Sequence, residues 1–175
     1  MDKYVALLRG VNVSGKNKIK MADLREALSR SIIDNVETYI QSGNIIFEAD
    51  IPAKESEELI NLVIKKEFGF DVPVLVLSVE TLKTVVECNP FLDKVDDEKK
   101  LYVAFLFDYP STDGVQRLSD ADTKGDEYYM DGEILYACYH NGMGKSKMDN
   151  NFFENKLKVS VTMRNWKTVN VLAGS

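Results

Sequence analysis

The sequence predicts an α+β protein made of two successive β-α-β-β-α-β units with antiparallel sheets. Short apolar runs of strand length alternate with segments whose apolar residues recur at helical spacing. Two compact turn signals, Ser42-Gly43-Asn44 and Asp131-Gly132, each fall between two such runs. Hydrophobic residues make up 45% of the 175 residues and charged residues 29%, so the chain has enough apolar side chains to bury a core.

The first unit begins with an apolar strand at Tyr4–Leu8, which ends at a polar, glycine-containing loop. A helix is expected next, because apolar side chains recur at helical spacing at Met21, Leu24, Ala27 and Leu28.

Strands are expected at Val36–Gln41 and Ile45–Glu48 on either side of the first turn. A helix with i, i+4 apolar pairs follows Pro52, and Gly69 is placed to cap its C-terminus. Pro73–Leu77 supplies the last strand of the unit, which completes the order of a ferredoxin-like fold.

The second unit repeats the order without an obvious residue-level repeat. Its expected elements are strand Leu101–Phe107, helix Ser111–Leu118, strands Glu127–Met130 and Glu133–Cys138, helix Asn150–Leu157, strand Val159–Thr162 and helix Asn165–Leu172. Ser78 can cap a linking helix that ends before Asn89-Pro90. We therefore expect one subdomain over residues 1–78, a linking helix and connection over 79–99, and a second subdomain over 100–175.

Charge, cysteines and hydropathy exclude several classes of protein. A net charge of −6 argues against a general polyanion binder. Cys88 and Cys138 form no C-x-x-C pair, which favours two buried apolar side chains over a disulfide or a structural zinc site. We see no secretory signal, and apolar runs such as Val74–Leu77 and Val103–Phe107 are too short to span a membrane. A soluble, cytoplasmic protein is the expectation.

Basic residues gather in segments that contain no acidic residue. These segments are residues 9–20, residues 141–147 and a pair, Arg164 and Lys167, near the C-terminus. Lysine charges and the backbone amides of glycine-rich loops commonly hold phosphates, so the pattern predicts an anionic ligand. Solvated lysines on glycine turns are the plain alternative. The residues predicted to bind are Arg9, Asn12, Lys16, Lys18, Lys20, Gln41, Asn44, Lys145, Ser146, Lys147 and Arg164.

Topology suggests how two of these segments relate. We expect strands one and three of each unit to be central, parallel neighbours. The loop over residues 10–20 then leaves one strand end, and the loop over residues 141–148 leaves the corresponding end in the other unit. The hypothesis is that both loops form a single site with Arg164.

Two segments match the phosphate-binding P-loop motif only in part. Gly10 and Gly15-Lys16 have the required spacing, but Asn17 replaces the Ser or Thr that binds magnesium. Gly144-Lys145-Ser146 has the right ending but lacks the first glycine. Neither lysine opens a predicted helix, so a P-loop NTPase is not expected.

Catalytic and metal sites have less support. His140 is the only histidine, and it lies two residues after Cys138, which places both side chains on one face of a strand. A structural histidine is favoured over a nucleophilic pair. The acidic stretch of residues 120–127 lacks the spacing of a calcium loop. We predict no metal and no cofactor.

Four segments of the sequence resemble a known family. They are Tyr4–Leu24, Thr38–Phe47, Gly144–Met148 and Thr162–Val169, and together they closely resemble the bacterial family known as domain of unknown function 1697. Lys167 departs from the pattern, which has Asn there. The resemblance implies two ferredoxin-like subdomains and implies no activity.

Three functions are consistent with these observations. The first is binding of a nucleotide, phosphate or single-stranded nucleic acid through the basic loops. The second is an enzyme that acts on a phosphorylated small molecule. There Arg9, Lys145 and Arg164 would hold the anion, and Asn12, Gln41, Asn44 or Ser146 would orient the reacting group. The third is an interaction module that pairs through an exposed strand edge. The sequence leaves the oligomeric state open.

Overall fold

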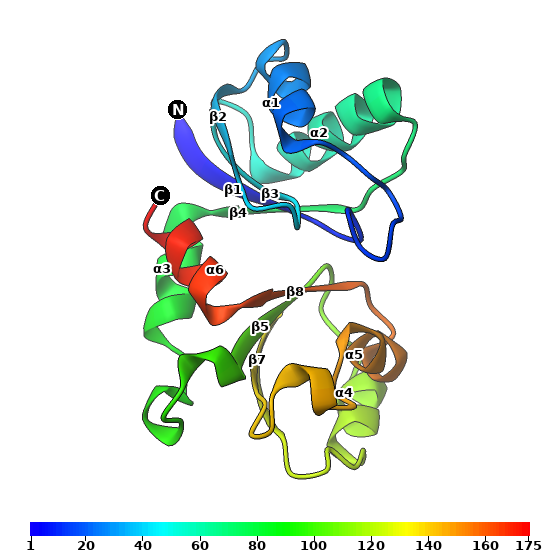
Figure 1. The fold of residues 1–175 in the computed structure, drawn as a ribbon, viewed down its shortest axis with the longest axis vertical. Helices are drawn as coiled ribbons and strands as arrows, with labels where there is room; N and C mark the ends of the chain where they lie inside the picture. Colours follow the sequence, from blue (N-terminus) through cyan, green and yellow to red (C-terminus); the bar gives the residue numbers. More distant parts are fainter. The chain divides into compact units, whose positions relative to one another are not determined.

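The chain folds as two units of similar topology. A computed structural model describes all 175 residues. One unit comprises residues 1–83 and 172–175, and the other comprises residues 84–171. Each unit holds a four-stranded antiparallel sheet and two helices that cover one of its faces (Figure 1). This arrangement confirms the α+β class and the two ferredoxin-like halves.

The first unit contains β1 (Asp2–Leu8), α1 (Met21–Ser29), β2 (Asp34–Tyr39), β3 (Asn44–Ala49), α2 (Ala53–Phe68) and β4 (Val74–Ser78). Its sheet has the order β2-β3-β1-β4. Helix α3 (Val79–Glu87) follows and crosses from one unit into the other. Ser78 caps α3 as predicted, since its Oγ accepts a hydrogen bond from Thr81 N at 3.0 Å.

The second unit contains β5 (Leu101–Leu106), α4 (Thr112–Ser119), β6 (Glu127–Asp131), β7 (Ile134–Cys138), α5 (Asn150–Leu157), β8 (Val161–Asn165) and most of α6 (Trp166–Ala173). Three short 3₁₀ turns lie at Leu92–Lys94, Glu98–Lys100 and Met143–Lys145. The sheet order β6-β7-β5-β8 matches that of the first unit.

The prediction that strands one and three run parallel is wrong. β1 pairs with β3 antiparallel, with Tyr4 opposite Phe47, and β5 pairs with β7 in the same way. A helical crossover leaves the second strand parallel to the first, and the hairpin then reverses the third. The loop after β7 therefore leaves its sheet beside the start of β5, where Leu101 faces Cys138. It occupies the end opposite to the one that the loop after β1 occupies in its own unit.

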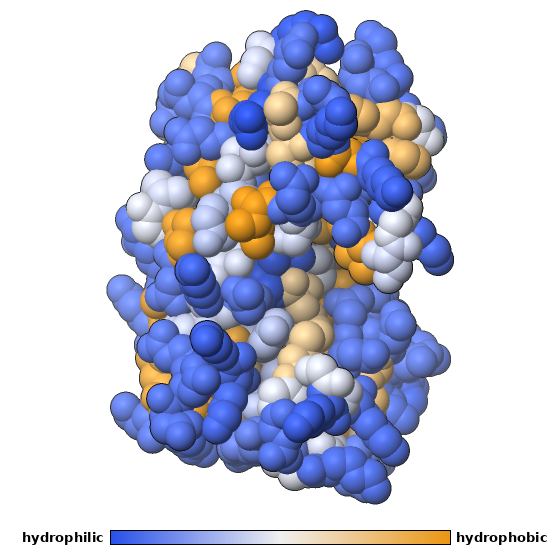
Figure 2. Space-filling view, in the orientation of Figure 1, coloured by the Kyte–Doolittle hydropathy of each residue, from blue (hydrophilic) through white to orange (hydrophobic).

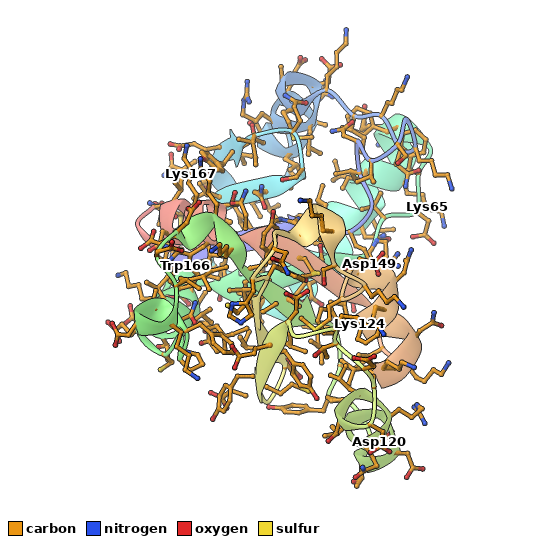
Figure 3. All side chains as sticks on the ribbon, turned by 60° about the horizontal axis from the view of Figure 1, so that its bottom comes forward. Lys65, Asp120, Lys124, Asp149, Trp166 and Lys167 are labelled. Atoms are coloured by element: carbon orange, nitrogen blue, oxygen red, sulfur yellow. The ribbon has the colours of Figure 1, made fainter.

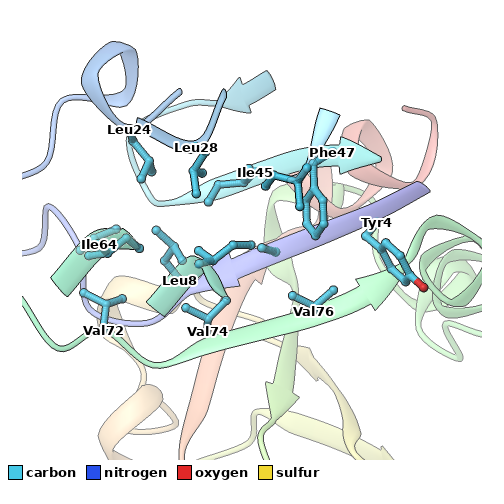
Figure 4. Packing of buried hydrophobic residues seen from close by; sticks show 14 of the residues in the cluster. Tyr4, Leu8, Leu24, Leu28, Ile45, Phe47, Ile64, Val72, Val74 and Val76 are labelled. Carbon is cyan, nitrogen blue, oxygen red and sulfur yellow. The ribbon is translucent and has the colours of Figure 1, made fainter. Parts of the chain in front are cut away.

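The core of the first unit lies between its sheet and helices α1 and α2. Alternate residues of β1, among them Tyr4 and Leu8, point toward these helices together with Ile45 and Phe47 of β3 (Figure 4). Complete burial of one such side chain contributes roughly 1.5–3 kcal/mol. Helix α2 ends as predicted at Gly69, where φ is 76° and the amide donates to Lys65 O at 3.0 Å.

The core of the second unit lies between its sheet and helices α4 and α5. Phe153 and Leu157 of α5 are buried against β5 and β7. At Gly114 of α4 a Cβ atom would lie 2.8 Å from Leu157 O, so the glycine permits the close approach of the two helices. Strand β8 begins two residues later than predicted and follows Lys158, which caps α5 with a left-handed φ of 58°.

None of the helices is long and apolar enough to cross a membrane. Hydrophilic side chains cover most of the face shown in Figure 2, and apolar residues are scattered among them.

Candidate functional site

The segment of residues 9–20 between β1 and α1, which we call the basic loop, has an unusual backbone. Positive φ angles of 46–75° occur at Gly10, Asn12, Ser14, Gly15 and Asn17. Val13 and Lys16 form an isolated bridge, and Lys16 N donates to Val13 O at 2.9 Å. A tight turn therefore lies within the loop, and Ser14 and Gly15 are its two central residues. Two positive φ angles at these central positions are typical of a type I′ turn.

The side chain of Asn12 holds the basic loop in place. Its Nδ2 donates to Ile19 O at 2.9 Å and to Gln41 O at 2.8 Å. Its Oδ1 accepts from Ile19 N at 2.9 Å. Both amide protons are thus bonded within the protein, and the loop is tied to the turn that precedes β3. Asn12 shapes the predicted site and leaves no free amide proton for a ligand.

The turn that precedes β3 packs against the base of the loop. At Gly43, where φ is 84°, a Cβ atom would lie 2.5 Å from Val11 Cγ2 and 2.7 Å from Leu8 Cβ. Asn44 is fully buried, and its Nδ2 donates to Tyr39 O and Ser42 Oγ at 3.0 Å. Asn44 therefore has a structural role, and Gln41 accepts a hydrogen bond from the loop through its backbone carbonyl.

A pocket of about 450 Å³ opens beside the basic loop. It is lined by Arg9, Gly10, Val13, Ser14, Lys16, Asn17, Asp71 and Pro73. The structure thus brings Arg9 and Lys16, two of the residues predicted to bind an anion, to one pocket. Lys18 and Lys20 are exposed on the same loop but do not line the pocket. Lys16, Lys18 and Lys20 form no ion pair. Asp71 is the one carboxylate there, and its Oδ1 accepts from Asn61 Nδ2 at 3.0 Å.

The second predicted loop, over residues 141–148, is anchored by Asp126. Its Oδ2 accepts from Ser146 Oγ at 2.6 Å, and its Oδ1 accepts from His140 N at 2.9 Å. The same Ser146 Oγ accepts from Met148 N at 3.1 Å. Ser146 therefore fixes the loop, whereas Lys145 and Lys147 are exposed.

Arg164 lies inside the protein with only 7% of its surface exposed. Its Nη1 donates to Thr162 Oγ1 at 2.7 Å and to Met163 O at 2.9 Å. Burial lowers the pKa of this guanidinium to about 10. Arg164 and residues 141–148 belong to one unit and the basic loop to the other, so a single shared site stays a prediction.

A larger groove, of about 850 Å³, lies in the second unit where β8 meets α6. Its lining consists of Asp97, Glu98, Lys99, Tyr102, Asn165, Trp166, Lys167, Asn170 and Val171. Trp166 and Lys167 come from the C-terminal segment (Figure 3). Trp166 is only 3% exposed, so it mainly anchors α6. Sequence patterns do not predict this groove, because its residues come from segments nearly 70 positions apart in the chain.

The predicted proximity of Cys138 and His140 is present in the structure. Cys138 Sγ lies 3.9 Å from His140 Nε2. Burial raises the pKa of the Cys138 thiol, and the carboxylates of Glu127 and Asp126 raise it further. A neutral thiol is a poor nucleophile, so this pair does not support covalent catalysis.

The chain is similar to a protein of known structure and to one protein family. No curated protein matches it. A solved structure titled as the conserved bacterial protein SP0830 from Streptococcus pneumoniae is similar, with 25% sequence identity and a TM-score of 0.73. That similarity covers 99% of this chain and 97% of the other. The family model described as "Protein of unknown function (DUF1697)" matches residues 1–136, which include the whole basic loop. The chain therefore belongs to the DUF1697 family.

Proposed function

We propose that the basic loop binds a phosphate-bearing ligand, either a nucleotide or single-stranded nucleic acid. The observation that carries the proposal is the grouping of Arg9 and Lys16 on one pocket, next to exposed Lys18 and Lys20. No acidic residue interrupts this loop, although the whole chain carries a net charge of −6. Hydrogen bonds from charged donors to phosphate are about twice as strong as neutral ones.

The fixed backbone of the loop supports the same proposal. Ser14 and Gly15 donate no amide hydrogen bond within the protein, and Ser14 lies on the lining of the pocket. Their amides are thus available to an anion. The three hydrogen bonds of Asn12 hold the loop before any ligand arrives. Prior ordering reduces the entropy lost on binding.

Asp71 narrows the class of ligand. A carboxylate repels phosphate but accepts hydrogen bonds from hydroxyl groups. A pocket with Arg9, Lys16 and Asp71 on its lining favours a ligand that carries a sugar hydroxyl beside its phosphate. Inorganic phosphate alone should therefore bind more weakly than a ribonucleotide.

The enzyme alternative has no comparable support. Asn12, Asn44 and Ser146, three of the four residues that would orient a reacting group, are hydrogen-bonded within the protein. We therefore propose binding without catalysis.

The proposed location of the protein is the cytoplasm. Cys88 and Cys138 are free thiols, as expected in a reducing compartment.

Calorimetric titration of the full chain tests the proposal with three probes: ATP, a ten-nucleotide oligo-U and inorganic phosphate. Lys16→Ala should weaken the binding of the active probe about tenfold, the loss expected for one charge-assisted hydrogen bond. Lys3→Ala is the matched control, because Lys3 is exposed near the far end of β1. If the oligonucleotide is the ligand, log Kd should change with log salt with a slope of roughly 2 for three phosphate contacts.

Two results would refute the proposal. One is the absence of binding by all three probes at low salt. The other is an equal loss of affinity in Lys16→Ala and Lys3→Ala, which would show that only net charge matters.

A further inference from the structure

Three metal-ligating side chains converge on one face of the hairpin β6-β7. Glu127 and Cys138 are directly opposite each other across the two strands. His140 lies two residues beyond Cys138, so its side chain extends on the same face. One ligand atom from each residue lies within 4.8 Å of the other two. All three residues belong to the same unit.

The arrangement differs from that of a catalytic triad. In a triad one imidazole nitrogen faces the nucleophile and the other faces the carboxylate. Here His140 Nε2 lies 2.7 Å from Glu127 Oε2 and also 3.9 Å from Cys138 Sγ. One nitrogen cannot relay a proton between both partners. Three potential ligand atoms within 4.8 Å of one another are instead compatible with coordination of one metal ion.

The distances are close to those that a tetrahedral Zn²⁺ ion requires. Zn–S bonds of about 2.3 Å and Zn–N and Zn–O bonds of about 2.0–2.2 Å imply ligand atoms roughly 3.3–3.7 Å apart. The Sγ–Nε2 distance of 3.9 Å must shorten slightly, and the Nε2–Oε2 distance of 2.7 Å must lengthen by about 0.6 Å. Small rotations suffice, because the side chains of His140 and Glu127 are 39% and 45% exposed.

The surroundings define the site further. Cys138 is buried in the sheet, and the backbone of His140 is fixed by its hydrogen bond to Asp126 Oδ1. Solvent reaches His140 and Glu127, which leaves room for water as a fourth ligand. Asp126 adds negative charge nearby, whereas Lys94 and Lys100 add positive charge on the side of Cys138. A thiolate and an imidazole select Zn²⁺ or Co²⁺ over Mg²⁺ and Ca²⁺, which prefer oxygen ligands.

We infer that Glu127, Cys138 and His140 form a binding site for one divalent transition-metal ion such as Zn²⁺ or Co²⁺. The ion would displace the proton of the Cys138 thiol and the hydrogen bond between His140 and Glu127. With three protein ligands and one open position, the site has the composition of an accessible centre rather than a closed structural one.

Cobalt substitution in the full chain tests this inference. Protein stripped with a chelator should bind one Co²⁺ and develop a thiolate-to-cobalt absorption band in the near ultraviolet with the visible bands of a tetrahedral ion. Addition of Zn²⁺ should remove both, and Mg²⁺ and Ca²⁺ should not. Cys138→Ser should abolish the near-ultraviolet band. Cys88→Ser is the matched control and should retain it, because Cys88 is an exposed thiol that is not part of the cluster.

Cys138 is buried, so a second variant protects the test against misfolding. His140→Ala changes a partly exposed side chain, and its metal-free form should melt within a few degrees of the unchanged protein while its Co²⁺ affinity falls at least tenfold. The inference is overturned if the unchanged protein gives no thiolate band with Co²⁺. It is also overturned if that band survives Cys138→Ser, disappears in Cys88→Ser, or forms with equal affinity in His140→Ala.

Discussion

Removal of the Asn12 side chain tests the mechanism that orders the basic loop. Three hydrogen bonds of 2.8–2.9 Å depend on this side chain. Each contributes roughly 0.5–1.5 kcal/mol, and one of them is exposed, so Asn12→Gly should destabilise the loop by about 2 kcal/mol. Asn12→Ala should cost about 1 kcal/mol more, because φ is 54° at this position and alanine disfavours the left-handed region.

Hydrogen exchange at the Ile19 amide is the most direct assay. That amide donates to Asn12 Oδ1, so its exchange reports the hydrogen bond itself. A loss of about 2 kcal/mol corresponds to roughly 30-fold faster exchange if the loop opens locally. Fluorescence of the single tryptophan, Trp166, is unsuitable because that residue belongs to the other unit.

Asn17→Gly is the matched control for this prediction. Asn17 also has a positive φ, of 46°, but its side chain makes one bond, from Nδ2 to Gly10 O at 3.1 Å. Its replacement should accelerate exchange of the Ile19 amide by about fivefold at most, because only one bond is lost. Equal effects of the two substitutions, or an unchanged Ile19 amide in Asn12→Gly, would refute the role assigned to Asn12.

Three further predictions concern the same two units. Gly43→Ala should destabilise the protein by about 3 kcal/mol through overpacking and backbone strain, whereas Gly10→Ala, with no neighbour within 4 Å of its Cβ, should cost about 1 kcal/mol in urea denaturation. Asp126→Ala should cost roughly 1.5–3 kcal/mol and accelerate hydrogen exchange of the His140 amide, because a charged acceptor is lost. Burial raises the pKa of Tyr136 to about 12, above its unfolded value near 10. Its stabilising contribution should therefore be complete below pH 10 and lost as the pH rises through about 12. The stability difference between the unchanged protein and Tyr136→Phe should shrink over that range, and a constant difference would contradict this assignment.

Local patterns were sufficient to predict most of the fold. The two hairpin turns and the cap at Gly69 are encoded within a few residues, so they could be predicted to within two residues. The turns lie at residues 40–43 and 132–133, and Asn44 and Asp131 belong to strands β3 and β6. The direction of the third strand depends on the crossover that precedes it, and the expectation of parallel neighbours ignored that geometry. The late start of β8 follows a left-handed helix cap at Lys158, a non-glycine residue whose positive φ no composition rule predicts.

The candidate site was predictable where its residues are neighbours in sequence. Arg9 and Lys16 line one pocket because a short turn brings them together. The hydrogen bonds by which the Asn12 side chain holds the basic loop were not predictable, since the bond to Gln41 O spans 29 residues. Glu127 was missed as a partner of Cys138, although the sequence contains the signal. Counting outward from the Asp131-Gly132 turn places these two residues opposite each other in the hairpin register.

The two units share one fold, but a long connection follows a different strand in each unit. In the first unit the long connection follows β1 and is basic, whereas the equivalent connection after β5 is short and contains Asp108 in place of lysines. In the second unit the long connection follows β7, next to the cluster of Cys138 and His140. Because strands one and three are antiparallel, these connections leave opposite ends of equivalent sheets. The two proposed sites share no residue, so Lys16→Ala should leave the cobalt spectrum unchanged and Cys138→Ser should leave phosphate binding unchanged. A substitution that abolished both would act through global unfolding, and neither site could then be assigned from its effect.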